Sequence, residues 1–201
     1  MLWSIVIPVK GSVGKSRLDA GDARAALAVA FARDTITAAR ASASVDRVVV
    51  VTCDPAVTRD LQGIEVVDDP ARGLHAAIGA GVATLAPDQP SAIMLGDLPA
   101  LTPAALDAAL ELAAHEPRSY VADAIATGTT LLAAQRPDGL RPRFGPGSAD
   151  LHRRAGHVEL AVPPDSGLRV DVDELADLHI AIDLGVGEHT EAVLVEASLA
   201  A

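Results

Sequence analysis

Carboxylates stand at two places in the sequence where an apolar run ends. Asp97 follows the run Ala92–Leu95, and Asp171 and Asp173 follow a second run farther along the chain. Magnesium bound to a nucleotide takes only one or two protein carboxylates and fills its octahedron with phosphate oxygens and water. We therefore expect Asp97 to ligate Mg²⁺, with Asp171 or Asp173 completing the site. The structural alternative is that Asp97 caps the turn after it and that Asp173 caps the next helix.

A short basic loop follows the first apolar run, Leu2–Val9. Its Gly14–Ser16 segment suggests a P-loop, but a P-loop needs a glycine five residues before Gly14, and Val9 stands there. Backbone amides and cations at the carboxyl end of a strand can still hold a triphosphate, because open α/β sheets bind ligands at that edge. A solvated basic turn is the alternative. The residues expected to contact a nucleotide here are Lys10, Gly14, Lys15 and Arg17.

A third group of residues lies around the loop 135–147, which carries three arginines in an otherwise acidic chain. The loop leads into Arg143–Ser148, where glycines expose backbone amides and a helix beginning near Ser148 presents its positive end to an anion. Thr130, on the apolar segment before the loop, lies opposite if its strand runs into the same cleft. A small phosphorylated acid suits such a site, with the planar guanidinium of Arg143 binding its carboxylate. An ordinary Gly-Pro turn is the alternative.

The elements that must position these groups follow from the spacing of apolar residues. Runs of strand length alternate with longer amphipathic segments, which is typical of βαβ units and predicts a mostly parallel sheet with helices on both faces. We expect one α/β domain over residues 1–201. The predicted strands are Leu2–Val9, Arg47–Thr52, Ile64–Val67, Ala92–Leu95, Tyr120–Ala124, Thr129–Ala134, Val158–Val162 and Leu168–Val172. The predicted helices are Asp22–Ser42, Pro55–Leu61, Leu74–Leu85, Pro103–His115, one starting at Ser148, Glu174–Asp183 and Glu188–Ala197.

Composition argues against several classes of protein. Sixteen basic against twenty-seven acidic residues give a formal net charge of −11, which repels polyanions and argues against a nucleic-acid partner. No apolar stretch has the length of a membrane span and no basic segment precedes the N-terminal apolar run, so we expect a cytoplasmic protein. Cys53, the single cysteine, is expected to be a small buried packing residue. Apolar residues of the last helix leave room for a homodimer: Val193, Leu194, Val195 and Leu199.

Taken together, these motifs resemble those of the 2-phospho-L-lactate or phosphoenolpyruvate guanylyltransferase family, which acts in biosynthesis of the deazaflavin coenzyme F-420. The resemblance covers nearly the whole chain. Many nucleotidyltransferases share the Gly-Asp-Leu-Pro element, whereas the Phe-Gly-Pro-Gly-Ser element together with Asp-Val-Asp is specific. The matching segments are Val9-Lys10, Lys15-Ser16-Arg17-Leu18, Gly96-Asp97-Leu98-Pro99, Arg143-Phe144-Gly145-Pro146-Gly147-Ser148, Gly167-Leu168-Arg169-Val170-Asp171-Val172-Asp173 and Ala176-Asp177-Leu178.

The resemblance implies a Rossmann-like, GT-A-like nucleotidyltransferase fold and a reaction between GTP and a small phosphorylated carboxylic acid. The phosphate of phosphoenolpyruvate or 2-phospho-L-lactate would attack the α-phosphorus of GTP, and pyrophosphate would leave. No general base is needed, because the attacking oxygen is already anionic. Catalysis then consists of alignment and charge neutralisation, by Lys15, Arg17 and the Mg²⁺ ion on Asp97.

The resemblance also assigns the remaining site residues. Thr130, Gly145 and Ser148 would hold the phosphorylated acid, and Asp97 and Asp171 would ligate Mg²⁺, with Asp173 a further candidate. His75 would contact the nucleotide, at a position where the family usually has asparagine. Two other functions stay open: another nucleotidyltransferase of this fold, of the sugar-phosphate or molybdopterin type, and a regulatory domain without catalysis. The acceptor acid also stays open among phosphoenolpyruvate, 2-phospho-L-lactate and 3-phosphoglycerate.

Overall fold

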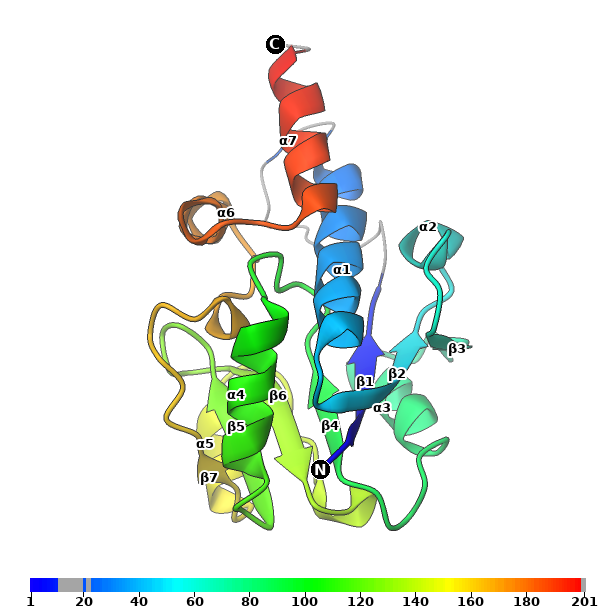
Figure 1. The fold of residues 1–201 in the computed structure, drawn as a ribbon, viewed down its shortest axis with the longest axis vertical. Coiled ribbons are helices and arrows are strands. Elements are labelled where there is room, and N and C mark those ends of the chain that lie inside the picture. Colours follow the sequence, from blue (N-terminus) through cyan, green and yellow to red (C-terminus); the bar gives the residue numbers. More distant parts are fainter. Residues whose placement is uncertain (11–19, 21–22, 200–201) are drawn as a thin grey trace.

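A central β-sheet organises the computed structural model, which describes residues 1–10, 20 and 23–199 (Figure 1). Among these residues, seven strands form one sheet in the order β3-β2-β1-β4-β6-β5-β7. Neighbouring strands pair in parallel except at β6, which runs antiparallel to both β4 and β5. The mostly parallel α/β sheet predicted from the sequence is therefore confirmed. The strands are β1 (Trp3–Pro8), β2 (Val45–Val51), β3 (Glu65–Val67), β4 (Ser91–Met94), β5 (Arg118–Ala122), β6 (Thr129–Ala134) and β7 (Val158–Glu159).

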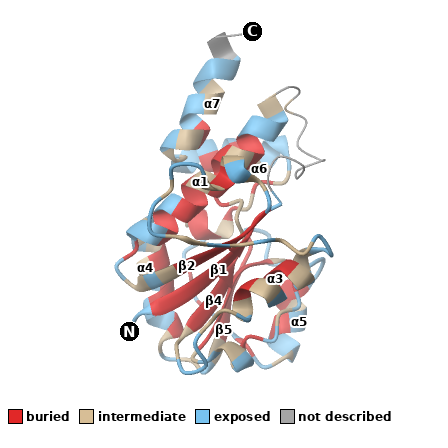
Figure 2. Ribbon diagram, turned by 90° about the vertical axis from the view of Figure 1, so that its right-hand side faces the viewer, coloured by how far each residue is buried: buried red, intermediate tan, exposed pale blue. Residues whose placement is uncertain are grey.

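Helices cover both faces of this sheet, as Figure 2 shows. Side chains such as Ile5 and Met94 face α1 and α4, whereas Val6 and Ile93 face α3 and α5. Central strands buried on both faces explain the continuous apolar runs in the sequence. No helix of the described chain combines the length and apolar composition needed to cross a membrane. The helices are α1 (Arg24–Ala41), α2 (Pro55–Thr58), α3 (Leu74–Val82), α4 (Pro103–Ala113), α5 (Ser148–Arg154), α6 (Leu175–Leu184) and α7 (Glu188–Leu199).

The segment that precedes Asp171 is not a strand, so the prediction of a strand at Leu168–Val172 is wrong. Gly167–Arg169 form a short 3-10 helix, η4, which Ser166 caps by accepting the N–H of Leu168 through its hydroxyl (3.3 Å). Alternation of apolar residues suggested a strand, but the buried side chains of this segment pack in two different clusters. Leu168 packs with residues of the sheet, α1 and α4, whereas Val170 and Val172 pack with residues of α1 and α6.

Two smaller expectations also need correction. The strand predicted at Val158–Val162 is limited to β7, which pairs with β5 over only two residue positions. Cys53 is exposed and not buried, and its Sγ lies 3.3 Å from the carbonyl oxygen of Asp69. The cysteine stands two residues after β2 ends at Val51, where the chain has left the sheet.

Helix α7 is anchored to α1 through Asp34. The buried carboxylate of Asp34 accepts the N–H groups of His189 (3.0 Å) and Thr190 (2.9 Å) in the first turn of α7. Val193 and Leu194 then pack against the apolar cluster that α1 contributes to. Two of the four apolar residues that were considered for a homodimer contact therefore pack against the rest of the same chain.

Gly167 lies where η4 passes the turn after β4. A Cβ atom placed on Gly167 would lie 1.9 Å from the carbonyl oxygen of Ala100. Gly167→Ala must therefore push two backbone segments apart, and we expect the free energy of unfolding to fall by about 1–3 kcal/mol. Gly79→Ala is the matched control, because Gly79 lies in α3 with open space around it. It should leave stability unchanged or raise it by roughly 0.5–1 kcal/mol. Denaturant unfolding measures both variants, and equal stability would contradict this close approach.

Candidate active site

Asp97 lies in the turn after β4, at the carboxyl edge of the sheet, and hydrogen bonds from two distant segments hold this turn. The N–H of Leu95 donates to the carbonyl of Thr130 on β6 (2.9 Å). The carbonyl of Asp97 itself accepts the N–H of Val172 (3.1 Å). The turn is thus tied both to β6 and to the segment after η4, which carry other predicted site residues.

A third support of the turn comes from Thr35 in α1. The buried hydroxyl of Thr35 accepts the N–H of Leu98 (3.0 Å) and donates to the carbonyl of Phe31 (2.8 Å). Gly96 is needed beside it, because a Cβ there would lie 2.7 Å from a methyl group of Val9. Nothing in the sequence indicated this role for Thr35. A threonine hydroxyl inside a helix can bond to its own helix, as it does to Phe31, and the distant partner Leu98 leaves no mark in the local sequence.

Asp171 and Asp173 are brought beside Asp97 by the hydrogen bond from Val172, which stands between them. Burial raises the pKa of Asp171 from 3.8 to about 7, and the negative charge of Asp97 is the next cause. The charges of Asp123 and Asp173 act in the same direction with smaller effect. Asp171 therefore lies within electrostatic reach of Asp97, Asp123 and Asp173, and we call these four residues the carboxylate cluster.

Asp173 does not cap the helix that follows it, so that alternative is wrong. The N-cap of α6 is Glu174, whose side chain accepts a backbone N–H of the first turn. The carboxylate of Asp177 accepts the N–H groups of Asp173 (3.0 Å) and Glu174 (2.9 Å) in return. This reciprocal capping starts α6 and fixes the backbone that leads out of the carboxylate cluster.

Asp123, the fourth carboxylate, follows β5 as Asp97 follows β4. Its side chain accepts the N–H groups of Thr127 (2.8 Å) and Gly128 (2.7 Å) and so closes the turn between β5 and β6. Its carbonyl accepts a hydrogen bond from the guanidinium of Arg169 (2.9 Å). Sequence reasoning missed Asp123, because the strand predicted at Tyr120–Ala124 included it, whereas β5 ends at Ala122.

The carboxylates present fit a Mg²⁺ ion that is shared with a nucleotide. Within the described ranges, no three His, Cys, Asp or Glu side chains are grouped to hold a metal ion by themselves. A nucleotide-bound Mg²⁺ needs only one or two carboxylates, and Asp97 and Asp171 provide two hard oxygen donors. A divalent cation would also offset the repulsion that contributes to the raised pKa of Asp171. The chemistry of the donor set is therefore consistent with magnesium.

Thr130 lies at the start of β6, beside the turn that carries Asp97. Its side chain is fully buried, and its hydroxyl has no hydrogen-bond partner among the described residues. Buried hydroxyl groups nearly always have a partner, because leaving one without a hydrogen bond costs about 1–3 kcal/mol. Such a group is a candidate for completion by a ligand, as the sequence proposed for Thr130.

The loop before α5 has the open backbone that its glycines suggested. Gly145 (φ 128°) and Gly147 (φ 72°) both have positive φ, and a Cβ on either would meet only open space. The amide of Ser148, however, donates to the carbonyl of Gly145, and the next amide donates to Thr127. The amide of Ser148 is therefore already bonded within the loop, and its hydroxyl stays the candidate for contact with the acid. The side chain of Arg143 is exposed.

The predicted nucleotide residues are only partly within the described chain. Lys10 is exposed at the end of β1, next to β4 in the sheet. Exposed His75, in the first turn of α3, has its Nε2 atom 3.0 Å from the carbonyl oxygen of Phe144. The structure thus places His75 beside the loop proposed for the acid. The others, Gly14, Lys15 and Arg17, lie outside the described residues.

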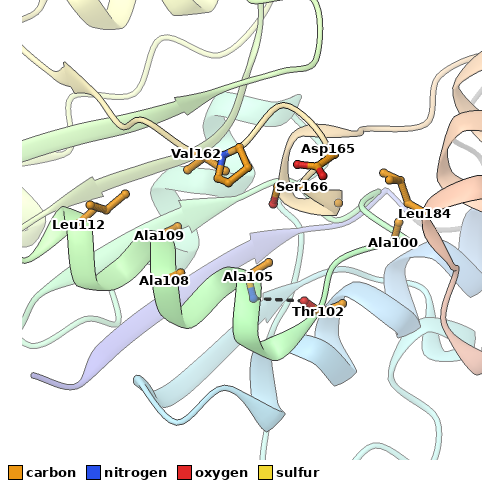
Figure 3. Close-up of a pocket in the computed structure, with 12 residues that line it drawn as sticks. Ala100, Thr102, Ala105, Ala108, Ala109, Leu112, Val162, Asp165, Ser166 and Leu184 are labelled. Carbon is orange, nitrogen blue, oxygen red and sulfur yellow. Dashed lines mark hydrogen bonds between the residues drawn. The ribbon is translucent and has the colours of Figure 1, made fainter.

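A separate hollow of about 290 Å³ lies between α4 and the segment 162–167 (Figure 3). Four alanines contribute to its lining, with Leu112 and Leu184 at its sides. Thr102 and Ser166 are among its polar residues, and each already caps a helix. None of the predicted site residues lines this hollow, so it is distinct from the carboxylate cluster.

Comparison with known proteins defines the class of protein. A family model described as the MobA-like NTP transferase domain matches residues 30–145. A solved nucleotidyl transferase from Methanothermobacter thermautotrophicus has the same fold, with a TM-score of 0.62 and 24% identity over 91% of this chain and 97% of that chain. Fold, carboxylate cluster and family model together define a nucleotidyltransferase.

Closer relatives identify the particular family. A phosphoenolpyruvate guanylyltransferase from Streptomyces scabiei is 47% identical over 96% of this chain and 95% of its own length. One from Streptomyces avermitilis is 46% identical over 96% of this chain and 94% of its own length. The chain belongs to the phosphoenolpyruvate guanylyltransferase family, as the sequence motifs indicated.

The raised pKa of Asp171 predicts how stability depends on pH without metal. Between pH 4 and about 7 the folded protein keeps a proton on Asp171 that the unfolded chain releases, so stability falls as pH rises through this window. Asp171→Asn should lack this contribution and melt higher than the wild type at pH 8 in EDTA. The gain is about 2–4 °C for each kcal/mol of lost repulsion.

Asp165→Asn is the control for this measurement, because Asp165 is an exposed carboxylate on the same segment. Its melting temperature should follow the wild-type curve from pH 5 to pH 8. A parallel curve for Asp171→Asn as well would show that Asp171 is not held beside other negative charges.

Proposed function

We propose that this chain transfers GMP from GTP to phosphoenolpyruvate, with Mg²⁺ as cofactor and release of pyrophosphate. The observation that carries the proposal is the meeting of Asp97 and Asp171 at the turn after β4. Nucleotidyl transfer needs a cation between protein carboxylates and phosphates, and this pair can hold one. The names of the relatives support the choice of acceptor. The product would enter biosynthesis of the deazaflavin coenzyme F-420.

In the proposed reaction, a phosphate oxygen of phosphoenolpyruvate attacks the α-phosphorus of GTP. The bond between that phosphorus and the bridging oxygen of the leaving pyrophosphate breaks, and no proton has to be removed from the anionic attacking oxygen. Bound Mg²⁺ would neutralise charge on the triphosphate and the leaving group. Asp97 and Asp171 would hold the cation in their ionised forms, and the hydrogen bond from the N–H of Val172 to the carbonyl of Asp97 keeps the two segments together.

The acceptor acid would lie between β6 and the loop before α5. The hydroxyl of Thr130 gains a partner when a phosphate or carboxylate oxygen reaches it, which supports the assignment made from the sequence. The Ser148 hydroxyl and the open backbone at Gly145 would face the same acid. Arg143 would bind the carboxylate, since a guanidinium can donate two parallel hydrogen bonds to it.

The triphosphate would lie on the parallel half of the sheet. Lys10 follows β1, and β1 pairs with β4, so Lys10 lies at the same sheet edge as Asp97. We assign Gly14, Lys15 and Arg17 to the phosphates from the sequence alone, with the two cations neutralising charge in the transition state. His75 would approach the nucleotide from the first turn of α3. There it also contacts Phe144 in the loop before α5, which we call the acceptor loop.

The activity test is release of pyrophosphate from GTP and Mg²⁺ in the presence of each acid. We expect turnover with phosphoenolpyruvate and little with 3-phosphoglycerate, and 2-phospho-L-lactate is the third arm. Turnover with a sugar phosphate, or with none of the acids, would contradict the proposal.

Two substitutions test the assignment of residues. Asp97→Asn should reduce kcat by more than tenfold, which corresponds to at least about 1.4 kcal/mol of barrier, because it removes a negative ligand of the cation. Thr130→Val should raise KM for the acid by roughly ten- to a hundredfold, the effect of a lost hydrogen bond to a charged group. Asp46→Asn, at an exposed position near the opposite end of β2, is the control. Full activity of Asp97→Asn in a folded protein would refute the metal assignment.

A further inference from the structure

The backbone of Arg143 and Phe144 is held from two sides by histidines. The N–H of Arg143 donates to Nε2 of His152 at 2.8 Å. The carbonyl of Phe144 lies 3.0 Å from Nε2 of His75. His152, in α5, is fully buried, whereas His75 is exposed in α3. These two residues of the acceptor loop therefore depend on side chains for their backbone hydrogen bonds.

The partners of His152 fix its tautomer. A backbone N–H can only donate, so Nε2 of His152 must carry a lone pair and its proton must lie on Nδ1. Nδ1 is 2.9 Å from the hydroxyl oxygen of Thr129, which can accept that proton. Burial lowers the pKa of His152 to about 4, and the charges of His157, Arg143 and His75 act in the same direction. The ring is therefore neutral and has a defined donor and acceptor.

This single ring joins the two sides of the proposed acceptor pocket. Through Nδ1 it binds Thr129, the neighbour of Thr130 on β6, and through Nε2 it binds the backbone of Arg143. The ring of Phe144 also packs edge-on against it, with centroids 5.2 Å apart. The position of Arg143 relative to β6 is thus set by contacts to one buried side chain.

We propose that His152 is a positioning residue for the acceptor acid, because it holds the backbone of Arg143 and the ring of Phe144 at a fixed place opposite Thr130. This inference rests on the proposed function. His152 does not touch the acid itself and does not take part in proton transfer. Its loss should therefore weaken binding of the acid, while binding of GTP and the rate at saturation change little.

Three variants separate the two hydrogen bonds of His152. His152→Phe keeps the packing and loses both bonds, His152→Gln keeps an acceptor near the place of Nε2, and His152→Asn keeps a donor near Nδ1. We expect KM for phosphoenolpyruvate to rise about tenfold in the Phe and Asn variants, in line with a lost backbone hydrogen bond, and to return close to the wild-type value in Gln. KM for GTP should stay within about twofold throughout.

His157→Phe is the matched control. His157 is a buried histidine whose Nδ1 contacts the carbonyl of His152 (3.2 Å), and no described bond joins it to residues 143–148. It should lower the melting temperature without changing KM for phosphoenolpyruvate. If every histidine variant raises both KM values together, or if His152→Asn behaves as the wild type, the role of His152 is structural and the proposal is overturned.

A second measurement on the wild-type protein does not depend on whether the variants fold. Nitrogen-15 NMR of the His152 ring should show the proton on Nδ1, and phosphoenolpyruvate alone should shift these resonances more than GTP alone does. A proton on Nε2 would overturn the proposal. A wild-type enzyme that shows no turnover with phosphoenolpyruvate would instead refute the proposed function, so the two failures are distinguishable.

Discussion

Two carboxylates that repel each other, Asp97 and Asp171, are held together at the carboxyl edge of β4, and the proposed chemistry depends on this contact. Burial and the neighbouring charge of Asp97 raise the pKa of Asp171 to about 7, so the fold bears an electrostatic cost there. The hydrogen bond from Val172 to the carbonyl of Asp97 joins the two segments, and Thr35 holds the next residue of the turn. Functional sites commonly retain such repulsion because a ligand relieves it. A cation shared with a nucleotide would be that ligand.

The sheet topology explains why two substrates can meet at this place. β4 lies between the parallel strand β1, whose end leads to Lys10, and the antiparallel strand β6, whose start carries Thr130. Since β6 runs in the opposite direction, its first residues lie beside the last residues of β4. A nucleotide bound on the side of β1 and an acid bound on the side of β6 would therefore both border Asp97. His152 then connects the acceptor loop to β6.

The sequence predicted the parts of the site that depend on local pattern. Asp97 was found because it follows an apolar strand, and the four parallel strands were found because strands buried on both faces are continuously apolar. The strand predicted at Leu168–Val172 was wrong, since alternate residues of an irregular segment can also be buried, here Leu168 against the sheet and Val170 and Val172 against α1 and α6. His152 could not be found, because its partners lie 9 and 23 residues away and no local pattern marks them. Asp123 was missed because the predicted strand Tyr120–Ala124 extended past it, whereas β5 ends at Ala122.

The proposed reaction requires Asp97 and Asp171 to hold one divalent cation together in the nucleotide complex. The most direct measurement is anomalous diffraction from crystals grown with Mn²⁺ and a non-hydrolysable GTP analogue, because manganese takes the same hard oxygen ligands as magnesium. We expect one strong anomalous peak within bonding distance of a carboxylate oxygen of Asp97 and of Asp171, with phosphate oxygens completing the ligand set. A nucleotide in the site with its cation bound by phosphates alone, or by carboxylates elsewhere on the chain, would contradict it.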